Sequence, residues 1–373
     1  MRSEMSTRRI QNQKGFSIVE LMLALGLGLV VVTGIVQLFI GNSQTSALIA
    51  GQARLQENAR FAFDFISRAT RRAGYFGCSP EAQNIVRGLV GDYNLLPEYN
   101  ITRIIEGHES DGAGNWNPPL TALPGGTPGN TNDSPAGEID IAQLAAASVP
   151  SDVLVIRNLQ EPGQTLTQTL QPLDNPIVTA PGGNPGFGVG DIVMVADCEQ
   201  GAVFRVTGLN VAGNTATVLH ASGAGFFDNA VNVSSPVGIV PFTLSFLGRS
   251  YGPEAVVGAI ETTYFFVAPS TRADNQGNLP DALWQKVGAA GPVELIQGVD
   301  TMDILYGIDT TLADGIPNPN QYVTADAVPD PSQIVAIRVT IGVNSVNAVT
   351  DDGNRLTRTF SKTILVRNAN PEA

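Results

Sequence analysis

The most constraining feature of the sequence is an uninterrupted apolar segment near its start. Residues 21–40, LMLALGLGLVVVTGIVQLFI, contain no charged side chain. As a helix that rises about 1.5 Å per residue, they would extend about 30 Å, the thickness of the hydrocarbon core of a bilayer. One acid, Glu20, stands directly before this segment, where burial in lipid would cost roughly 2.5–3.5 kcal/mol. The segment therefore predicts a membrane helix, and Glu20 needs an explanation of its own.

The charges on either side of this segment differ in sign. The first 15 residues have a net charge of +3, from Arg2, Arg8, Arg9 and Lys14 against Glu4, whereas the whole chain has −13. Because basic flanks stay in the cytoplasm, we expect a single-pass membrane protein with a cytoplasmic amino-terminus. The acidic remainder would lie outside the cytoplasm. Its charge argues against a nucleic-acid-binding surface, and no direct nucleic-acid contact is predicted.

Three kinds of amino-terminal segment compete. A secretory signal peptide would have a shorter apolar region, although Gly41 and Ser43 offer a small-x-small cleavage site after it. A plain signal anchor accounts for the apolar length but not for Glu20 or the Lys-Gly-Phe junction. KGFSIVELMLALGLGLVV at 14–31 resembles the class III signal of type IV prepilins and pseudopilins. In that family a basic leader ends in Gly and is followed by Phe or Met, an acid four residues on, and an apolar helix.

This resemblance implies a role for each unusual residue. Prepilin peptidase would remove the leader 1–15 after Gly15, and Phe16 would become an N-methylated amino-terminus. Gly15 suits a flexible cleavage junction because it has no side chain. On assembly, Glu20 of one subunit would pair with the Phe16 amine of its neighbour, since a low dielectric penalises either charge alone. The alternative is an isolated Glu20 that reaches the membrane interface.

An amphipathic helical pattern continues beyond the membrane segment. Gly74 is well placed as a helix C-cap, with Arg71 and Arg72 in the last turn, where cations suit the helix dipole. We therefore predict one helix from Phe16 to Ala73 within a segment 16–74. Residues 18–40 would lie in the membrane or the filament core, and the second half would pack on a globular body. The apolar stripe has 3–4 spacing and comprises Leu48, Leu55, Ala59, Ala62, Ile66, Ala69 and Ala73, widened by Phe61 and Phe65.

The remainder, 75–373, has strand-like runs between turn-rich segments and no long helical period. We therefore expect an α+β, pilin-like fold, in which an antiparallel β-sheet body with long loops covers the long amino-terminal helix. The expected strands lie at 138–144, 152–159, 190–198, 202–209, 215–220, 258–268, 300–308, 333–344 and 358–368.

Four further stretches resemble one particular family, whereas the amino-terminal signal is shared by prepilins and pseudopilins in general. They are RLQENARFAFDFISRATRRAGYFGC at 54–78, VELIQGVDTMDILYGIDT at 293–310, IVAIRVTIGVNS at 334–345 and TFSKTILVRNANP at 359–371. All four resemble PilW-family minor pilins of type IV pili, whereas residues 79–190 show no specific resemblance. Two alternatives remain: a type II secretion minor pseudopilin of the J class, and a membrane-anchored binding module or enzyme.

The PilW resemblance implies function and partners. Such a protein joins the pilus at or near its tip, primes assembly with other minor pilins and supports a large tip adhesin. Twitching motility, adhesion and DNA uptake would then depend on it indirectly. The implied partners are other minor pilins, the major pilin, the prepilin peptidase and methyltransferase, the inner-membrane assembly platform and the tip adhesin.

The chain has two cysteines, Cys78 and Cys198. Outside the cytoplasm a disulfide is the natural interpretation, and a loop of about 120 residues would contribute roughly 4–5 kcal/mol in the chain-entropy model. The cysteine in ADC at 196–198 also fits the second cysteine of the resembled family. Two free thiols are the alternative, and a zinc site with His108 and His220 lacks metal-ligand spacing.

No enzymatic motif directs the interpretation elsewhere. The sequence contains no H-E-x-x-H and no P-loop, so we expect neither an enzyme nor a cofactor, and no catalytic role for His108 or His220. Loops rich in Asp and Asn occur at 273–278, 309–315 and 350–355. Such loops can bind calcium, but Asp and Asn with Gly are also ordinary turn formers.

Overall fold

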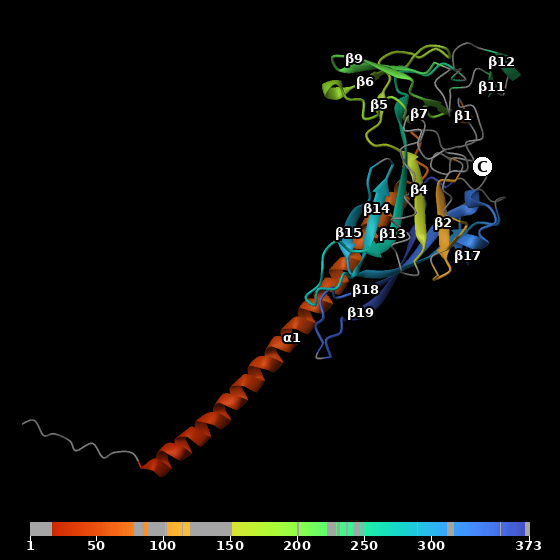
Figure 1. Ribbon diagram of the computed structural model, residues 1–373. Coiled ribbons are helices and arrows are strands. Elements are labelled where there is room, and N and C mark those ends of the chain that lie inside the picture. Colours follow the sequence, from red (N-terminus) through yellow and green to blue (C-terminus); the bar gives the residue numbers. More distant parts are fainter. Residues whose placement is uncertain are drawn as a thin grey trace, which may run out of the picture.

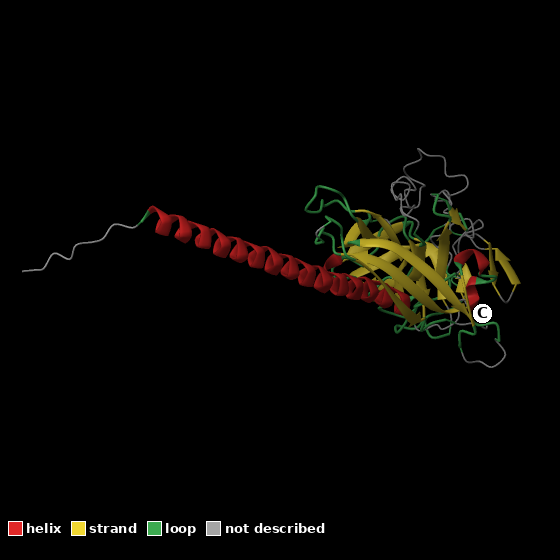
Figure 2. Cartoon of the chain, turned by 90° about the horizontal axis from the view of Figure 1, so that it is seen from below, coloured by secondary structure: helices red, strands yellow, loops and turns green. Residues whose placement is uncertain are grey.

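One long helix projects from a β-rich body (Figure 1). The helix, α1, is Ile18–Arg72 and its 55 residues extend about 80 Å. Figure 2 shows that the body covers only its carboxyl-terminal part. The computed structural model describes residues 17–77, 85–87, 101, 103–113, 115–119, 151–199, 201–221, 229, 232–235, 238–241, 247, 249–288, 290–311, 317–350 and 352–369.

The predicted apolar stripe of α1 is buried from Leu55 onward. Ile66 and Ala62 are fully buried, and Leu55, Ala59, Ala69 and Ala73 are buried with them. Phe65 is partly buried and packs against the same core. The prediction was wrong for Leu48, which is 36% exposed, and for Phe61, which is 47% exposed. The body does not reach Leu48, because the first buried residue of α1 is Gly51. Phe61 lies on the helix face away from the core, since each residue turns the helix by about 100°.

The end of α1 agrees with the sequence. Ala73 is the C-cap, and its N–H donates to the carbonyl oxygen of Ala69 at 3.0 Å. Gly74 follows with φ +70°, a conformation that glycine adopts without steric cost. Its N–H donates to the carbonyl oxygen of Arg157 at 2.9 Å, so the helix terminus is hydrogen-bonded to the body.

The described strands of the body form four sheets. The largest has the order β1-β8-β7-β13-β4-β2-β3, with β14, β15 and β5 attached through β13, and β17-β16-β18-β19 form a second sheet beside α1. Two small sheets are β6-β10-β9 and β11-β12. The bounds are β1 Ile85–Arg87, β2 Ile105–Ser110, β3 Trp116–Asn117, β4 Val153–Leu159, β5 Gln164–Thr165, β6 Ile177–Thr179, β7 Ile192–Ala196, β8 Gly201–Arg205, β9 Gly208–Ala212, β10 Thr215–Leu219, β11 Asn232–Ser235, β12 Gly238–Pro241, β13 Val256–Pro269, β14 Asp281–Val287, β15 Val293–Gln297, β16 Val299–Ile308, β17 Gln321–Val323, β18 Ile334–Asn344 and β19 Thr357–Leu365.

These sheets form two lobes joined by the long strand β13. The helix-side lobe has a core made by the buried stripe of α1 with β2, β4, β13, β14, β16, β18 and β19. The distal lobe comprises β5 to β10 and has a separate core that includes Val193, Phe204 and Val218. β13 pairs with β7 over Val256–Ala259 and with β4 over Ile260–Phe265. In Figure 1 the distal lobe lies at the end of the body farthest from the start of α1.

The predicted α+β class is confirmed. The expected strands at 152–159, 190–198, 215–220, 258–268, 300–308, 333–344 and 358–368 correspond to β4, β7, β10, β13, β16, β18 and β19. The stretch 202–209 was wrongly predicted as one strand, because the chain leaves β8 at Arg205 and begins β9 at Gly208. The stretch 138–144 lies outside the described residues. The pairing of β1 with β8 is parallel, and every other pairing between described strands is antiparallel.

Candidate functional site

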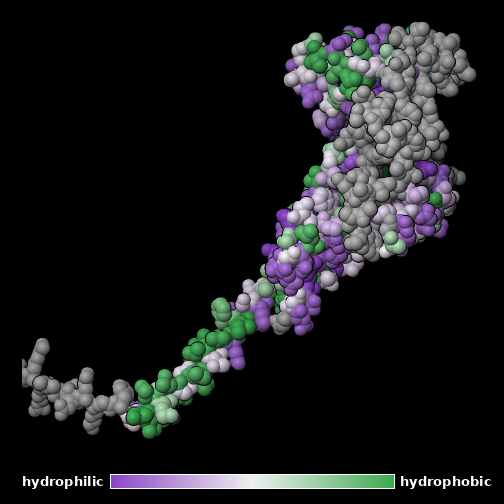
Figure 3. All heavy atoms as spheres, viewed as in Figure 1, coloured by the Kyte–Doolittle hydropathy of each residue, from purple (hydrophilic) through white to green (hydrophobic). Residues whose placement is uncertain are grey.

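The amino-terminal half of α1 is an exposed apolar rod. From Ile18 to Ser46 every side chain is exposed, and large residues such as Leu38 (75%) and Phe39 (74%) contact nothing that would bury them. An 18-residue window of the helix has a mean hydropathy of 2.4, enough to cross a membrane, and Figure 3 shows this part as a continuous hydrophobic surface. Such a surface must be covered by lipid or by other apolar helices.

Glu20 lies in the first turn of this rod. Ser17 is the N-cap of α1, and its side chain accepts the Val19 N–H at 3.3 Å. Ser17 and Glu20 have the S-x-x-E spacing of a capping box, a signal that the sequence analysis missed. A carboxylate here is favoured by the positive end of the helix dipole. Gly15 and Phe16 lie outside the described residues, so cleavage, methylation and pairing with Glu20 stay predictions.

Gly51 marks the point where α1 meets the body. A β-carbon at Gly26, Gly28, Gly34 or Gly41 would have no neighbour within 4 Å, whereas at Gly51 it would lie 3.1 Å from Val349 Cγ2. The same β-carbon would lie 3.4 Å from Leu356 Cδ1. The absence of a side chain at Gly51 therefore lets the loop between β18 and β19 approach the helix closely.

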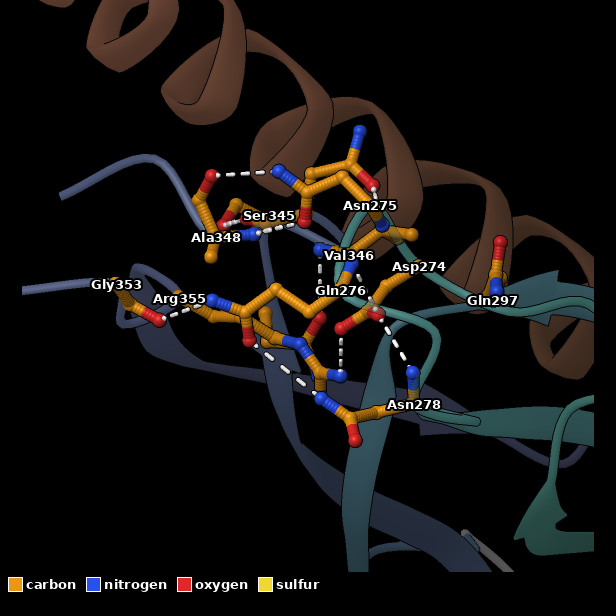
Figure 4. A network of polar contacts seen from close by, with 12 residues as sticks. Asp274, Asn275, Gln276, Asn278, Gln297, Ser345, Val346, Ala348, Gly353 and Arg355 are labelled. Carbon is orange, nitrogen blue, oxygen red and sulfur yellow. Dashed lines mark hydrogen bonds and ion pairs between the residues drawn. The ribbon is translucent and has the colours of Figure 1, made fainter.

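Two loops hold each other beside this point (Figure 4). The Nδ2 group of Asn275, in the β13–β14 loop, donates to the carbonyl oxygen of Ala348 at 3.1 Å, and the Ala348 N–H donates to Asn275 Oδ1 at 3.0 Å. Arg355 forms an ion pair with Asp274 between the same two loops. These contacts fix the position at which the apolar rod leaves the body.

In the loops that the sequence analysis considered for calcium, the carboxylates of Asp274 and Asp309 bind groups of the protein itself. The stretches 273–278 and 350–355 do come together, but the cation at the Asp274 carboxylate is Arg355, whose hydrogen bond holds the pKa of Asp274 at about 2. In the third loop, Asp309 accepts the N–H groups of Thr311 and Asn318 at 2.9 Å each. Residues 312–316 lie outside the described part. Among the residues that are described, no group of three or more His, Cys, Asp or Glu could hold a metal ion.

The disulfide prediction concerns the junction of the two lobes. Cys198 follows β7 and is disulfide-bonded, whereas Cys78, the other cysteine of the sequence, lies outside the described residues. A β-carbon at Gly77 would lie 3.2 Å from Cβ of Ala196. Gly77 and Ala196, which stand shortly before the two cysteines in the sequence, are therefore in contact, and the Cys78–Cys198 pairing stays a prediction.

Both histidines are buried and hydrogen-bonded to backbone. His108 Nδ1 lies 2.7 Å from the carbonyl oxygen of Pro118, and His220 Nε2 lies 2.9 Å from that of Asp174. Burial lowers the pKa of each imidazole. The prediction that the sequence has no G-x-S-x-G nucleophile elbow was wrong, because GRSYG at 248–252 has this spacing. However, the exposed Ser250 hydroxyl donates to Gln171 Oε1 at 2.9 Å and not to a histidine.

A buried carboxylate joins the two sheets of the helix-side lobe. Asp152, at the start of β4, accepts the Ser110 N–H from β2 at 3.0 Å and the Ile304 N–H from β16 at 2.7 Å. Burial, with the nearby carboxylates of Glu109 and Asp303, raises the pKa of Asp152 to about 7. Its ionisation near neutral pH therefore affects the contact between β2, β4 and β16.

Comparisons with known families bear on both parts of this structure. The model of the type IV pilus-assembly protein W matches residues 264–365, and that of the prokaryotic N-terminal methylation motif matches 10–36. Searches of curated proteins and of solved structures found no match. The first match runs from within β13 to the end of β19, and the second covers the start of the exposed rod. Together the two matches support a type IV pilus-related pilin.

Proposed function

We propose that this prepilin, which matches the PilW family, is a minor pilin incorporated at or near the tip of a type IV pilus. There it primes assembly together with other minor pilins and supports a large tip adhesin. Twitching motility, adhesion and DNA uptake depend on it indirectly, through the pilus that it initiates.

The exposed apolar half of α1 is the observation that carries this proposal. It begins at the methylation motif and is long enough to cross a membrane. Before assembly it anchors the chain in the inner membrane with the amino-terminus in the cytoplasm, where prepilin peptidase cleaves after Gly15. The assembly platform then moves the helix from lipid into a filament core. Both environments bury the same apolar surface, so the transfer requires no refolding of the body.

Pairing between subunits explains why an acid is retained at position 20. A methylated amino-terminal amine is a cation, and Glu20 is the only carboxylate between residues 16 and 56 of this chain, so Glu20 is the group that can pair with the amine of a neighbouring subunit. In an apolar core, a register that separates these charges leaves both of them unpaired. The pair therefore selects the assembled register, even where its net contribution to stability is small.

The distal lobe supports a position at the tip. It lies at the end of the body farthest from the start of α1 (Figure 1), which is the end directed away from the membrane. In the shaft of a filament, this space is needed for the next subunit. A chain with additional mass on this side fits best where no subunit follows, which favours a low-abundance tip subunit over a shaft subunit.

The body's contribution is structural in this proposal, with no enzymatic reaction. The Arg355–Asp274 ion pair and the loop contacts near Gly51 hold α1 at a fixed exit point, and the Cys78–Cys198 bond ties the end of α1 to the distal lobe. Both features suit a subunit that transmits force between its helix and its outer surface.

Deletion of the gene in a strain whose pilus retraction is also blocked tests this function. We expect far fewer surface pili than in the retraction-deficient parent, with piliation restored by the wild-type chain. Normal piliation in the deletion strain would contradict a priming role. Loss of secretion with normal pili would instead favour the type II secretion alternative.

A further inference from the structure

Among the described strands, none pairs with the outer edge of β19, which runs along the side of the body. β19 is the terminal strand of β17-β16-β18-β19, and its register with β18 decides which backbone groups are free. The Val366 N–H donates to the carbonyl oxygen of Val335, directly opposite. Hydrogen-bonded pairs alternate in an antiparallel ladder, so every second backbone N–H and C=O group points away from β18. The residues concerned are Thr357, Thr359, Ser361, Thr363 and Leu365, and their side chains are all exposed.

Cations line this edge on the helix side. Arg358, Phe360 and Lys362 alternate with the outward-facing residues, and Lys362 lies 6.0 Å from the ring of Phe63 on α1. Arg358 lies 5.2 Å from the ring of Phe360. Two basic side chains, Arg358 and Lys362, therefore flank the outer edge of β19 on the side that faces α1.

The neighbouring face of α1 extends the same charge. Phe63 shares a helix face with Arg60, Ser67 and Arg71. Arg60 lies three residues before Phe63, and Ser67 and Arg71 lie four and eight residues after it, which are the spacings of side chains on one face of a helix. Arg60 and Arg71 are exposed. Ser67 is 5% exposed, and its hydroxyl is buried without a hydrogen-bond partner among the described residues.

None of these cations is neutralised within the described part of the chain. Arg60, Arg71, Arg358 and Lys362, with Arg367 just after β19, take part in none of the salt bridges there, whereas seven other arginines do. The chain as a whole has a net charge of −13. We name these five residues, together with the free edge of β19, the basic edge.

We propose that the basic edge binds an acidic, extended segment of a neighbouring pilus subunit, which adds to β19 as a further strand. Backbone hydrogen bonds to the five outward-facing residues would supply affinity, and carboxylates at alternate positions would pair with Arg358 and Lys362. The proposal rests on the proposed function, since it takes the partner from the same pilus.

Two other partners fit less well. The strand β19 runs from the loop at Gly51 toward the end of α1, so the cations follow the helix axis, and only the first of them is near a membrane that α1 crosses. A lipid surface would therefore leave most of the basic edge unused. Nucleic acid would use the charges but not the free backbone groups of β19.

The first experiment places a photoreactive benzoylphenylalanine at position 359 of the full chain, in cells that assemble pili. We expect an irradiation-dependent adduct with another pilus subunit. A second probe at position 30, on the exposed helix, reports packing of the rod independently. An adduct from position 30 without one from position 359 would overturn the basic edge and leave the proposed function intact; no adduct from either would count against both.

Two pairs of matched variants then separate the strand edge from the charge. Thr359→Pro removes an outward-facing N–H without touching the β18 ladder, and Thr359→Ala is its control. Arg358→Glu reverses a cation of the basic edge, and Arg54→Glu makes the same change on an exposed arginine outside it. For these variants the photoreactive residue is moved to position 363, on the same edge.

We expect Thr359→Pro and Arg358→Glu each to lower the position-363 adduct about tenfold, with both controls near wild type. Formation of the Cys198 disulfide in each variant checks that the body has folded. Equal effects of Arg358→Glu and Arg54→Glu would overturn the charge argument. Self-aggregation of Arg358→Glu with an unchanged adduct would mean that the cations only prevent edge pairing. Salt-sensitive retention of DNA by the wild-type chain, lost in Arg358→Glu, would assign the edge to nucleic acid and overturn the proposal.

Discussion

Neutralising Asp152 should remove a specific part of the pH dependence of folding. In the folded chain the pKa of this carboxyl is about 7, against an ordinary value of 3.8. Because the folded value is raised, the folded state holds a proton that the unfolded state releases. The contribution of Asp152 to stability is therefore complete below about pH 4 and is lost as the pH rises to 7.

The size of this effect follows from the linkage relation. Each pH unit between the two pKa values changes the free energy of unfolding by about 1.4 kcal/mol, so Asp152 lowers it by roughly 2–3 kcal/mol between pH 5 and pH 7.5. Asp152→Asn is neutral at both pH values and keeps one carbonyl acceptor for Ser110 or Ile304. The difference in unfolding free energy between pH 5 and pH 7.5 should shrink by that amount.

Tryptophan fluorescence during denaturant unfolding of the full chain in detergent measures this difference. The only tryptophans are Trp116 and Trp284; both pack in one cluster of the helix-side lobe, and Trp116 Nε1 donates to the carbonyl oxygen of Ser151 at 3.1 Å. Asp174→Asn, at an exposed position in the distal lobe, is the control. Parallel pH profiles for wild type and Asp152→Asn would refute the reasoning.

Three further predictions concern α1 and the disulfide. Glu20→Ala should leave cleavage of the leader unchanged but remove the chain from sheared pili, because the Phe16 amine of the neighbouring subunit then has no counter-charge. Undiminished incorporation into pili would contradict the proposed pairing. Ile66→Ala should destabilise the body by about 2–5 kcal/mol in denaturant unfolding, since Ile66 is fully buried, whereas Leu27→Ala, at a residue 67% exposed, should change stability by less than about 0.5 kcal/mol. Equal effects at the two positions would contradict the division of the helix. Cys198→Ser should increase the proteolytic sensitivity of the distal lobe and abolish the mobility shift between reduced and non-reduced chain on gels; a shift that persists would exclude a Cys78–Cys198 bond.

The sequence predicts α1 well because two periodic signals agree. Apolar length identifies the exposed half, and 3–4 spacing identifies the buried residues from Leu55 to Ala73. The error at Leu48 arises because periodicity does not reveal how far along the helix the body extends. The error at Phe61 is one of helix face: Phe61 was assigned to the buried stripe, whereas Phe63, which is 8% exposed, was overlooked.

The strands missed in the body have weak local signals. β14, DALWQKV, has no alternation of β-branched residues and is held by pairing with β13 and β15, so tertiary contacts decide its conformation. The sequence does not predict the two lobes either, because β13 has the pattern of a single strand but pairs with different strands in its two halves. The basic edge also depends on topology: Arg60 and Arg358 are almost 300 residues apart in the sequence and share a side of the body only after folding.

Mass spectrometry of the amino-terminus of the chain recovered from sheared pili is the most direct test of this account. We predict a mature protein that begins at N-methylated Phe16, without residues 1–15. A chain that retains Met1, begins after Ser43 or is absent from the pili would contradict the proposal that this protein is processed and assembled as a pilin.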